Sequence, residues 1–351
     1  MPSRGAVALV LLAVVAGCMS VPHAPPVSPT PPAASTPALR FVALGDMGTG
    51  GKDQLQVAKA IGTVCAARGC DFAVGLGDLI YPAGVKDAND PQFDTKFEQP
   101  YKDLDLPFWM VLGNHDNSQD PGGTSATGGL GLWYQSGDAE VAYAQRGDRA
   151  SDKWREPARY YTMDSANGLA HFVGLDTNTL LFYGVAVPPD LGAAIQAQED
   201  WLPGAVAAGN ASWRIAMGHH PYVSNGPHGD AGDYEGRDVP GQDGDHLKQL
   251  FEQDLCGKVD LYLAGHDHDL EWLQPVPACG ATQFIVSGGG GADLYDLAER
   301  DTPVFQKSTH GFWWIELTPT ALHAVAFDQD AHVLYDGAVP KPLGQAGAPA
   351  H

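Results

Sequence analysis

Five apolar runs in this chain end in the same way, with a glycine and then a side chain that can bind a metal ion. The clearest run covers residues 72–76 and predicts a short strand buried on both faces. Gly77 then allows a sharp turn, and Asp78 and Tyr81 follow. A carboxylate can bridge two cations through its two oxygens, whereas a nearby phenolate can bind only one of them. By itself this stretch does not distinguish a metal site from an aspartate that caps the next helix.

The other four runs repeat the arrangement with different polar side chains. The runs cover residues 41–44, 108–112, 213–217 and 259–264, and they lead into Gly45-Asp46, Gly113-Asn114-His115, Gly218-His219-His220 and Gly265-His266-Asp267-His268. Side chains at the carboxyl ends of strands in an α/β sheet converge on one crevice. A single Gly-Asp turn usually caps the next helix. Five such strand ends favour a shared metal site over five independent caps.

The remaining pattern predicts an α/β domain with helices between strands. Helices are expected from near Gln54 and over 196–208, a strand over 171–175, and a hairpin formed by 312–317 and 322–327. Asp176 ends a strand without a preceding glycine turn, which indicates a structural role. Residues 288–291 are four glycines without the Lys and Ser or Thr of a nucleotide-binding loop, so they predict close backbone packing.

The N-terminus has the features of a targeting segment. Arg4 precedes an apolar core at 6–16 that is too short to span a bilayer, and small residues lead to Cys18. We expect a lipoprotein signal peptide at 1–17, because a Pro- and Ala-rich stretch at 18–38 suits a disordered tether for an acylated Cys18. Ordinary secretion with cleavage near Ser20 is the alternative. The folded domain is expected at 39–337 and a flexible tail at 338–351.

The charge and the cysteine content limit the cell compartments and the binding partners that are compatible with this chain. The 20 basic and 42 acidic residues give a formal charge of −22, which argues against binding to nucleic acid or to an anionic membrane surface. Bound metals would then supply the local positive charge that holds an anionic substrate. Apart from Cys18, four cysteines allow three pairings, of which we favour Cys65–Cys70 and Cys256–Cys279 in an oxidising envelope compartment. Reduced, buried thiols are the alternative.

Residues 117–137 are rich in Gly, Ser, Thr and Asp and predict a long surface loop beside the site. Most of this loop is expected to be a tolerated insertion, and a contribution to substrate selection is the alternative.

These motifs resemble those of the calcineurin-like metallophosphoesterases. The matching stretches are Asp46-x-Gly48, Gly77-Asp78-x-x-Tyr81, Gly113-Asn114-His115-Asp116, Gly218-His219 and Gly265-His266-x-His268. Most of that superfamily has a histidine two residues after the first aspartate, where this chain has Gly48. The presence of Tyr81 instead is similar to the purple acid phosphatases, in particular the small type related to tartrate-resistant acid phosphatase. His220 is a departure, since the small animal enzymes usually carry tyrosine there.

The resemblance implies two packed β-sheets flanked by α-helices, with a dinuclear metal site at the strand ends. It places one metal on Asp46, Asp78, Tyr81 and His268, and the other on Asp78, Asn114, His219 and His266. The family uses Fe(III) with Fe(II), Zn(II) or Mn(II), and hard anionic oxygens do suit a trivalent ion. It also places His115 and His228 beside the metals, as catalytic residues that assist the leaving group.

The implied activity is hydrolysis of phosphate monoesters by water activated at the two metals. A phosphodiesterase would use the same centre, and a non-hydrolytic lipoprotein that binds metal or phosphate is a third alternative. Small phosphate esters are the expected partners, with the lipid anchor as the contact with the cell-envelope membrane. A monomer is expected.

Overall fold

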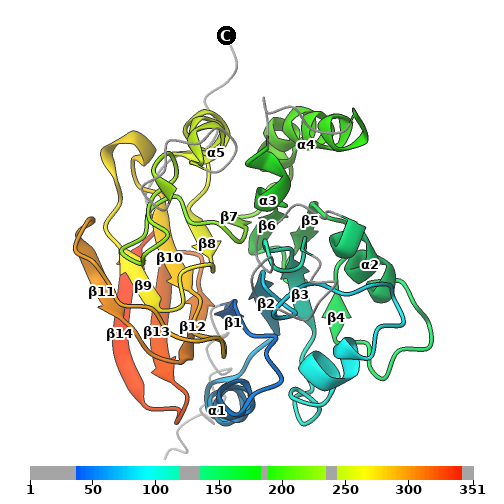
Figure 1. Ribbon diagram of the computed structural model, residues 1–351. Coiled ribbons are helices and arrows are strands. Elements are labelled where there is room, and N and C mark those ends of the chain that lie inside the picture. The colour runs from blue at the N-terminus through cyan, green and yellow to red at the C-terminus, as the bar shows by residue number, and fades with distance from the viewer. Residues whose placement is uncertain (1–36, 119–134, 183–188, 235–242, 342–351) are drawn as a thin grey trace, which may run out of the picture. The chain divides into compact units, whose positions relative to one another are not determined.

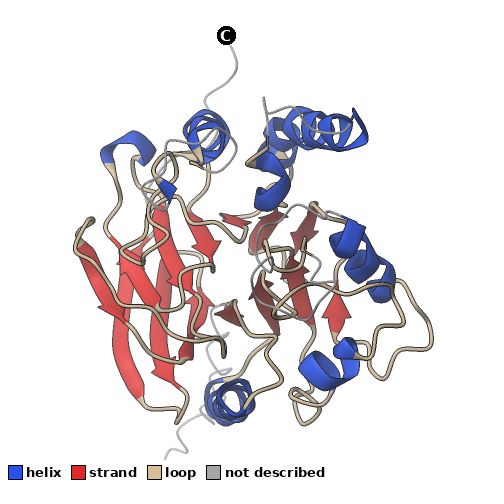
Figure 2. Ribbon diagram, viewed as in Figure 1, coloured by secondary structure: helices blue, strands red, loops and turns tan. Residues whose placement is uncertain are grey.

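The computed structural model describes residues 37–118, 135–182, 189–234 and 243–341. Two seven-stranded sheets form the centre of this part of the chain, and the helices lie outside them (Figures 1 and 2). In spatial order, the first sheet contains β14 (Val333–Pro340), β13 (Ala321–Asp328), β12 (Gly311–Leu317), β1 (Leu39–Leu44), β2 (Phe72–Leu76), β3 (Phe108–Val111) and β4 (Trp154–Arg155). The second contains β11 (Pro303–Lys307), β9 (Leu270–Leu273), β10 (Gln283–Ser287), β8 (Leu261–Ala264), β7 (Trp213–Met217), β6 (Ala170–Gly174) and β5 (Tyr161–Asp164).

Each sheet has a parallel part that carries the strands predicted to lead into the site. In the first sheet β1, β2 and β3 are parallel, with Phe41 opposite Phe72 and Ala73 opposite Phe108. In the second sheet β7 and β8 are parallel, with Ile215 opposite Leu261. The carboxyl ends of parallel strands lie at one edge of a sheet, so the residues that follow these five strands are brought to neighbouring positions.

The apolar core between the sheets is built from alternate strand residues. Phe41, Val74, Ile215 and Leu263 are all fully buried in it, together with Trp313. Fully burying a side chain of this size contributes about 1.5–3 kcal/mol. The central strands β1, β2, β3, β6, β7 and β8 are buried almost throughout, which explains why they appear in the sequence as continuous apolar runs. Among the edge strands, β5 alternates between buried and exposed positions, and β11 and β14 consist of exposed and half-buried positions.

Helices cover the outer faces of the sheets. The first sheet packs with α1 (Lys52–Arg68), the short helix η1 (Asp94–Glu98) and α2 (Gln135–Ala144). The second packs with α4 (Pro189–Ala207), α5 (Asp245–Leu250) and its continuation η3 (Phe251–Leu255). Two short helices, α3 (Thr177–Leu180) and η4 (Pro277–Cys279), lie in connecting segments. Among the described residues, none of these helices is long and apolar enough to cross a membrane.

Most of the predicted elements are confirmed, with shifted ends. The predicted helix 196–208 belongs to α4, which begins earlier, at Pro189. The C-terminal hairpin is formed by β12 and β13, and β14 adds a further strand that was not predicted. That strand runs to Pro340, into the segment predicted as a tail at 338–351.

The disulfides Cys65–Cys70 and Cys256–Cys279 are both present, as predicted. The glycines at 288–291 are closely packed, since a Cβ on Gly290 would lie 2.2 Å from the carbonyl oxygen of Gly45. The predicted signal peptide at 1–17, Cys18, most of the tether and residues 342–351 lie outside the described residues.

Candidate metal centre

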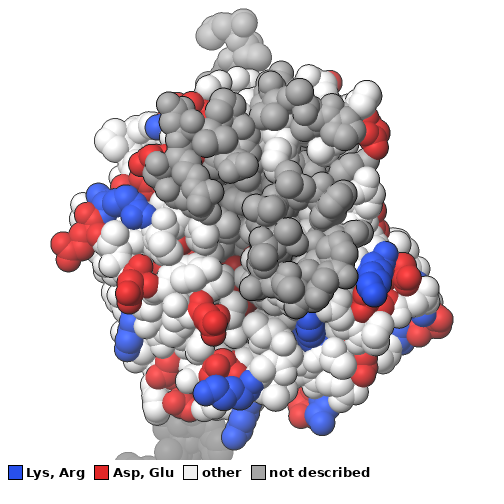
Figure 3. Space-filling view, in the orientation of Figure 1, with Lys and Arg blue, Asp and Glu red and all other residues white. Residues whose placement is uncertain are grey.

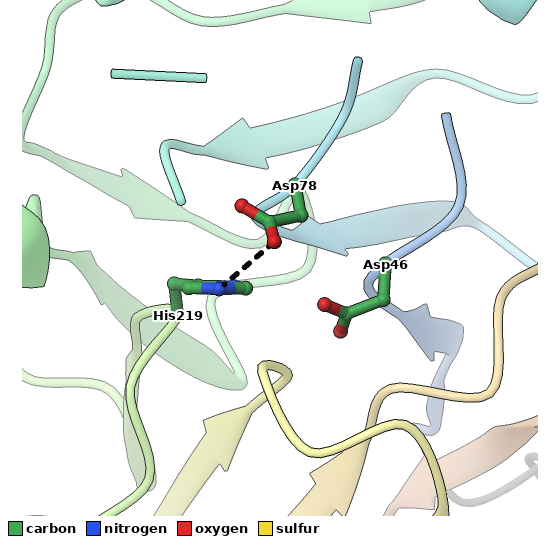
Figure 4. Close-up of side chains that lie close together, drawn as sticks. All are labelled: Asp46, Asp78 and His219. Atoms are coloured by element: carbon green, nitrogen blue, oxygen red, sulfur yellow. Dashed lines mark ion pairs between the residues drawn. The ribbon is translucent and has the colours of Figure 1, made fainter. Parts of the chain in front are cut away.

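The structure brings the predicted ligand side chains from both sheets to one place. Asp46, Asp78 and Asn114 follow β1, β2 and β3, whereas His219 follows β7 and the pair His266 and His268 follows β8. Figure 4 shows Asp46, Asp78 and His219 directed toward one another, with ligand atoms within 4.8 Å. We call this set of side chains, with Tyr81, the metal centre.

One half of the centre gathers around the hydroxyl of Tyr81. This oxygen lies 3.0 Å from Oδ1 of Asp46, 2.8 Å from Oδ2 of Asp78 and 3.0 Å from Nε2 of His268. The Nδ1 of His268 lies 2.5 Å from the carbonyl oxygen of Asp293, which accepts its proton and leaves a lone pair on Nε2. Two carboxylates, a phenol and an imidazole lone pair form a ligand set that suits a hard, highly charged cation.

The other half gathers around Nε2 of His219. This nitrogen lies 2.8 Å from Oδ1 of Asn114, 3.1 Å from Nδ1 of His266 and 3.4 Å from Oδ2 of Asp78. The carbonyl oxygen of Leu76, 2.8 Å from Nδ1 of His219, orients this ring in the same way. Because Oδ2 of Asp78 takes part in both halves, its carboxylate is placed to bridge two ions.

The charges of the centre fit a cation. Burial would lower the pKa of His219, but the adjacent carboxylate of Asp78 raises it to about 9. Burial would raise the pKa of Asp78, but His219 and His115 hold it well below its usual range. Without a cation, His219 therefore keeps a proton at a point where oxygen acceptors converge. A metal ion would replace that proton.

Tyr81 needs a cation in order to ionise. Burial raises the pKa of its hydroxyl well above the usual value, and the charges of Asp46 and Asp78 raise it further. A bound metal ion reverses this effect because its positive charge favours the phenolate.

The backbone of three centre residues is left-handed, which is rare for residues other than glycine. The φ angles are 58° at Asp46, 51° at Asp78 and 73° at His266. Hydrogen bonds hold these turns, because Oδ2 of Asp46 accepts from the backbone N–H of His266 (2.9 Å) and Oδ1 of Asp78 accepts from that of His115 (2.8 Å). Strained backbone of this kind is typical of functional sites.

The glycines before the ligands allow neighbouring strand ends to approach closely. A Cβ on Gly113 would lie 2.2 Å from Oδ1 of Asp78, and one on Gly77 would lie 2.5 Å from Nδ1 of His219. Gly77 also has a φ of 84°. The sequence predicts sharp turns at these glycines, which explains only part of the need for glycine. The larger part of the explanation is that each glycine faces a ligand side chain from another strand, where a side chain of its own would not fit.

The two histidines predicted as catalytic residues lie beside the centre. The ring of His115 lies 4.4 Å from that of Tyr81, and its Nε2 lies 3.8 Å from Oδ2 of Asp78. Its Nδ1 contacts the carbonyl oxygen of Pro82 at 2.6 Å, so Nε2 faces the centre. His228 stacks on His266, with ring centroids 4.0 Å apart. Both positions suit groups that act on a substrate, and the roles themselves stay predictions.

Three residues that support the centre were not assigned a role from the sequence. Asp116 accepts hydrogen bonds from the backbone N–H groups of Leu79 and Gly113, both at 2.8 Å, and so joins two ligand loops. Asp267 accepts from the N–H of His228 at 3.0 Å. Tyr295 stacks on His268 at 4.1 Å. Asp116 and Asp267 lie within the strand-end motifs, so their position in the sequence could have indicated a role at the centre. Nothing in the sequence indicates the contact of Tyr295.

Two further predictions concern neighbouring segments. Asp176 has the structural role expected of it, because Oδ1 caps α3 through the N–H of Thr179 and Oδ2 pairs with Arg159 at 2.8 Å. Of the predicted loop at 117–137, residues 119–134 lie outside the described part of the chain. Asn117 and Ser118 are buried, and α2 begins at Gln135.

Comparison with known proteins agrees with this geometry. The family model of calcineurin-like phosphoesterases matches residues 39–270. The chain is 29% identical to tartrate-resistant acid phosphatase type 5 of Sus scrofa, over 88% of each chain. It is 27% identical to purple acid phosphatase 7 of Arabidopsis thaliana, over 87% of each.

Solved structures share the fold at lower identity. A purple acid phosphatase from yellow lupin (Lupinus luteus) seeds superimposes with a TM-score of 0.62 at 19% identity, over 87% of this chain and 54% of the lupin chain. The Plasmodium protein GAP50, described as the anchor in the inner membrane complex, superimposes with a TM-score of 0.67 at 22% identity, over 87% and 89%. The fold predicted from the sequence, two packed sheets with flanking helices, is confirmed. The chain belongs to the calcineurin-like phosphoesterase family, and its Asp/His cluster fits the dinuclear metal centre of that family's purple acid phosphatases.

Proposed function

We propose that this chain hydrolyses phosphate monoesters at its dinuclear centre, as an acid phosphatase of the purple type. The observation that carries the proposal is the shared position of Asp78, whose Oδ2 is 2.8 Å from the Tyr81 hydroxyl and 3.4 Å from Nε2 of His219. One carboxylate thus serves two different ligand sets, one rich in anionic oxygen and one rich in neutral nitrogen.

The two ligand sets support different ions. Asp46, Asp78, Tyr81 and His268 would hold Fe(III), and Asp78, Asn114, His219 and His266 would hold Fe(II), Zn(II) or Mn(II). Such a pair of ions would supply a nucleophilic hydroxide at moderate pH and would neutralise the charge of the phosphoryl group.

His115 is proposed to donate a proton to the leaving group. Its Nδ1 is held by the Pro82 carbonyl, so the proton that it could transfer is on Nε2, the atom that faces the centre. His228, beside the rings of His266 and Tyr295, is the second residue proposed to assist the leaving group.

The charge of the chain favours small substrates with little negative charge of their own. With a net charge of −22, attraction of an anion is local to the metals. On the face in Figure 3, the basic side chains of the described residues are scattered around the edge, mostly near acidic ones, and form no large patch. We further propose that the protein is a monomer of the cell envelope, anchored through an acylated Cys18.

The test is an assay of the purified protein on phosphate monoesters, diesters and phosphoanhydrides, with metal analysis of the same preparation. The proposal expects two metals per chain, one of them iron, and the highest kcat/KM with monoesters. A clear preference for diesters would show that the protein is a phosphodiesterase and not a monoesterase. Two bound metals without cleavage of any ester would indicate a binding protein.

A further inference from the structure

His220 is a buried histidine beside the metal centre that belongs to neither ligand set. His220 follows His219 in the sequence, and only 3% of its surface is exposed. The ring lies 4.5 Å from that of His266 and 5.1 Å from that of His219. His220 is therefore next to the nitrogen-rich half of the centre, where a phosphoryl group would bind.

Thr177 determines which nitrogen of His220 carries a proton. The Oγ1 of Thr177 accepts hydrogen bonds from the backbone N–H groups of His219 (3.2 Å) and His220 (3.1 Å). A hydroxyl oxygen has two acceptor positions and one proton. Because both acceptor positions are filled, the hydroxyl proton must point to its third neighbour, Nδ1 of His220, at 2.9 Å. Nδ1 is thus an acceptor, and the neutral ring carries its proton on Nε2.

This tautomer excludes one role for His220 and favours another. A protonated Nε2 has no lone pair for a metal ion, and Nδ1 is occupied by Thr177, so His220 is not a third histidine ligand of the nitrogen-rich half. Within the described residues, the ring of His220 has one hydrogen bond, the one between Nδ1 and Thr177. The Nε2–H group is therefore available to an anionic oxygen bound in the centre.

We propose that His220 binds the substrate by donating a hydrogen bond from Nε2 to a non-bridging phosphoryl oxygen, with Thr177 as the residue that positions the donor. This inference rests on the proposed function, because it assumes that a phosphate group binds at the metals. It adds a phosphate-binding residue from the end of β7.

The experiment measures binding of inorganic phosphate to the metal-loaded, full-length protein by calorimetry. His220→Leu deletes the donor and keeps an apolar side chain of similar size. His220→Gln is the matched control, because its amide nitrogen reaches the position of Nε2 and can donate. A hydrogen bond to a charged group corresponds to roughly a ten- to hundredfold change in affinity. We expect the Kd for phosphate to rise by this factor in His220→Leu and to recover mostly in His220→Gln, with two metals retained in both.

Three results would overturn the inference. Unchanged phosphate affinity in His220→Leu would show that Nε2 does not reach the anion. Equal weakening in both variants would indicate a packing role, and loss of one metal in both would make His220 a ligand. A failure of the proposed function would give a different result. The wild-type protein would then cleave no monoester, although it would still bind phosphate in a way that depends on His220.

Discussion

The backbone N–H of Tyr81 donates a hydrogen bond of 2.8 Å to the carbonyl oxygen of Gly48. The loop that carries the tyrosine therefore lies directly on the glycine. A Cβ on Gly48 would be only 1.7 Å from the carbonyl oxygen of Leu79, so no side chain fits there while this loop keeps its place. The absence of a histidine at position 48 and the presence of a tyrosine at 81 are thus two consequences of one packing arrangement.

Gly48→Ala should accordingly disturb both the fold and the metal centre. Forcing a methyl group into a closely packed position typically costs about 1–3 kcal/mol, and here the loop must shift and carry Tyr81 with it. We expect a lower free energy of unfolding in denaturant titration and weaker iron binding. Gly147→Ala is the matched control, because a Cβ there has no atom within 4 Å. Equal stability of the two variants would contradict the packing argument.

Tyr81→Phe tests the phenolate ligand. If the hydroxyl binds Fe(III) as a phenolate, the metal-loaded protein should show a broad visible charge-transfer band, and the phenylalanine variant should lose it. The ring still packs beside His115 at this position, so the fold should persist. Absorption spectra with metal analysis of both proteins give the answer. A colourless, active, iron-free wild-type protein would refute the purple acid phosphatase assignment but not the wider family.

His115→Ala separates proton donation from metal binding. A positioned general acid contributes about a hundred- to ten-thousandfold. The loss in kcat/KM should therefore be large for alkyl phosphates, whose leaving groups need a proton, and smaller for aryl phosphates with acidic phenols. Both metals should remain, because Nε2 is 3.8 Å from Asp78 and outside the ligand sets.

Asp78→Asn provides the contrast for His115→Ala, since loss of the bridge should remove both metal occupancy and activity. If His115→Ala loses the same factor for every leaving group, the histidine only orients the phosphate. If the His115→Ala variant loses metal, His115 is a metal ligand.

Glu140→Gln tests an acid buried behind the site, on α2. Both carboxylate oxygens are buried with no hydrogen-bond partner among the described residues. Burial, with added repulsion from Asp116 and Glu156, raises the pKa of Glu140 well above 4.5. An acid with a raised folded-state pKa contributes stability below its unfolded pKa and loses it as pH rises. The loss is about 1.4 kcal/mol per pH unit until the folded-state pKa is reached.

We therefore expect Glu140→Gln to match the wild type in stability near pH 4 and to exceed it increasingly above pH 4.5. Thermal unfolding across this pH range measures the difference. Glu299→Gln, at an exposed position, is the control and should follow the wild type at every pH. A constant gap between Glu140→Gln and the wild type would show that Glu140 does not cause the pH dependence.

Cys18→Ser tests the anchor. The Pro- and Ala-rich stretch separates Cys18 from the folded domain, so the variant should leave the membrane fraction with its specific activity unchanged. Detergent partitioning of cell fractions measures this, with Cys65→Ser as a control that alters a structural disulfide and not the anchor. A wild-type protein that is already soluble would indicate simple secretion.

The strand-end pattern alone located the centre. Apolar runs that end in a glycine and a polar side chain are a local signal, and the edge of a parallel sheet is the one place where their ends meet. Asp46, Asp78 and Asn114 from one sheet, and His219, His266 and His268 from the other, could therefore be placed together without coordinates. Tyr81 was found in the same way, through its fixed distance in sequence from Asp78.

The tertiary structure decided everything that depends on contacts between distant segments. The stacking of Tyr295 on His268 and the contact of the Gly113 backbone with the Asp78 side chain arise from connections whose paths no periodicity encodes. The tertiary structure also decides which ring nitrogen of His220 carries the proton, because this depends on how many hydrogen bonds reach Oγ1 of Thr177. Sequence patterns report which face of a strand is buried, whereas a hydrogen-bond count requires the positions of all three partners.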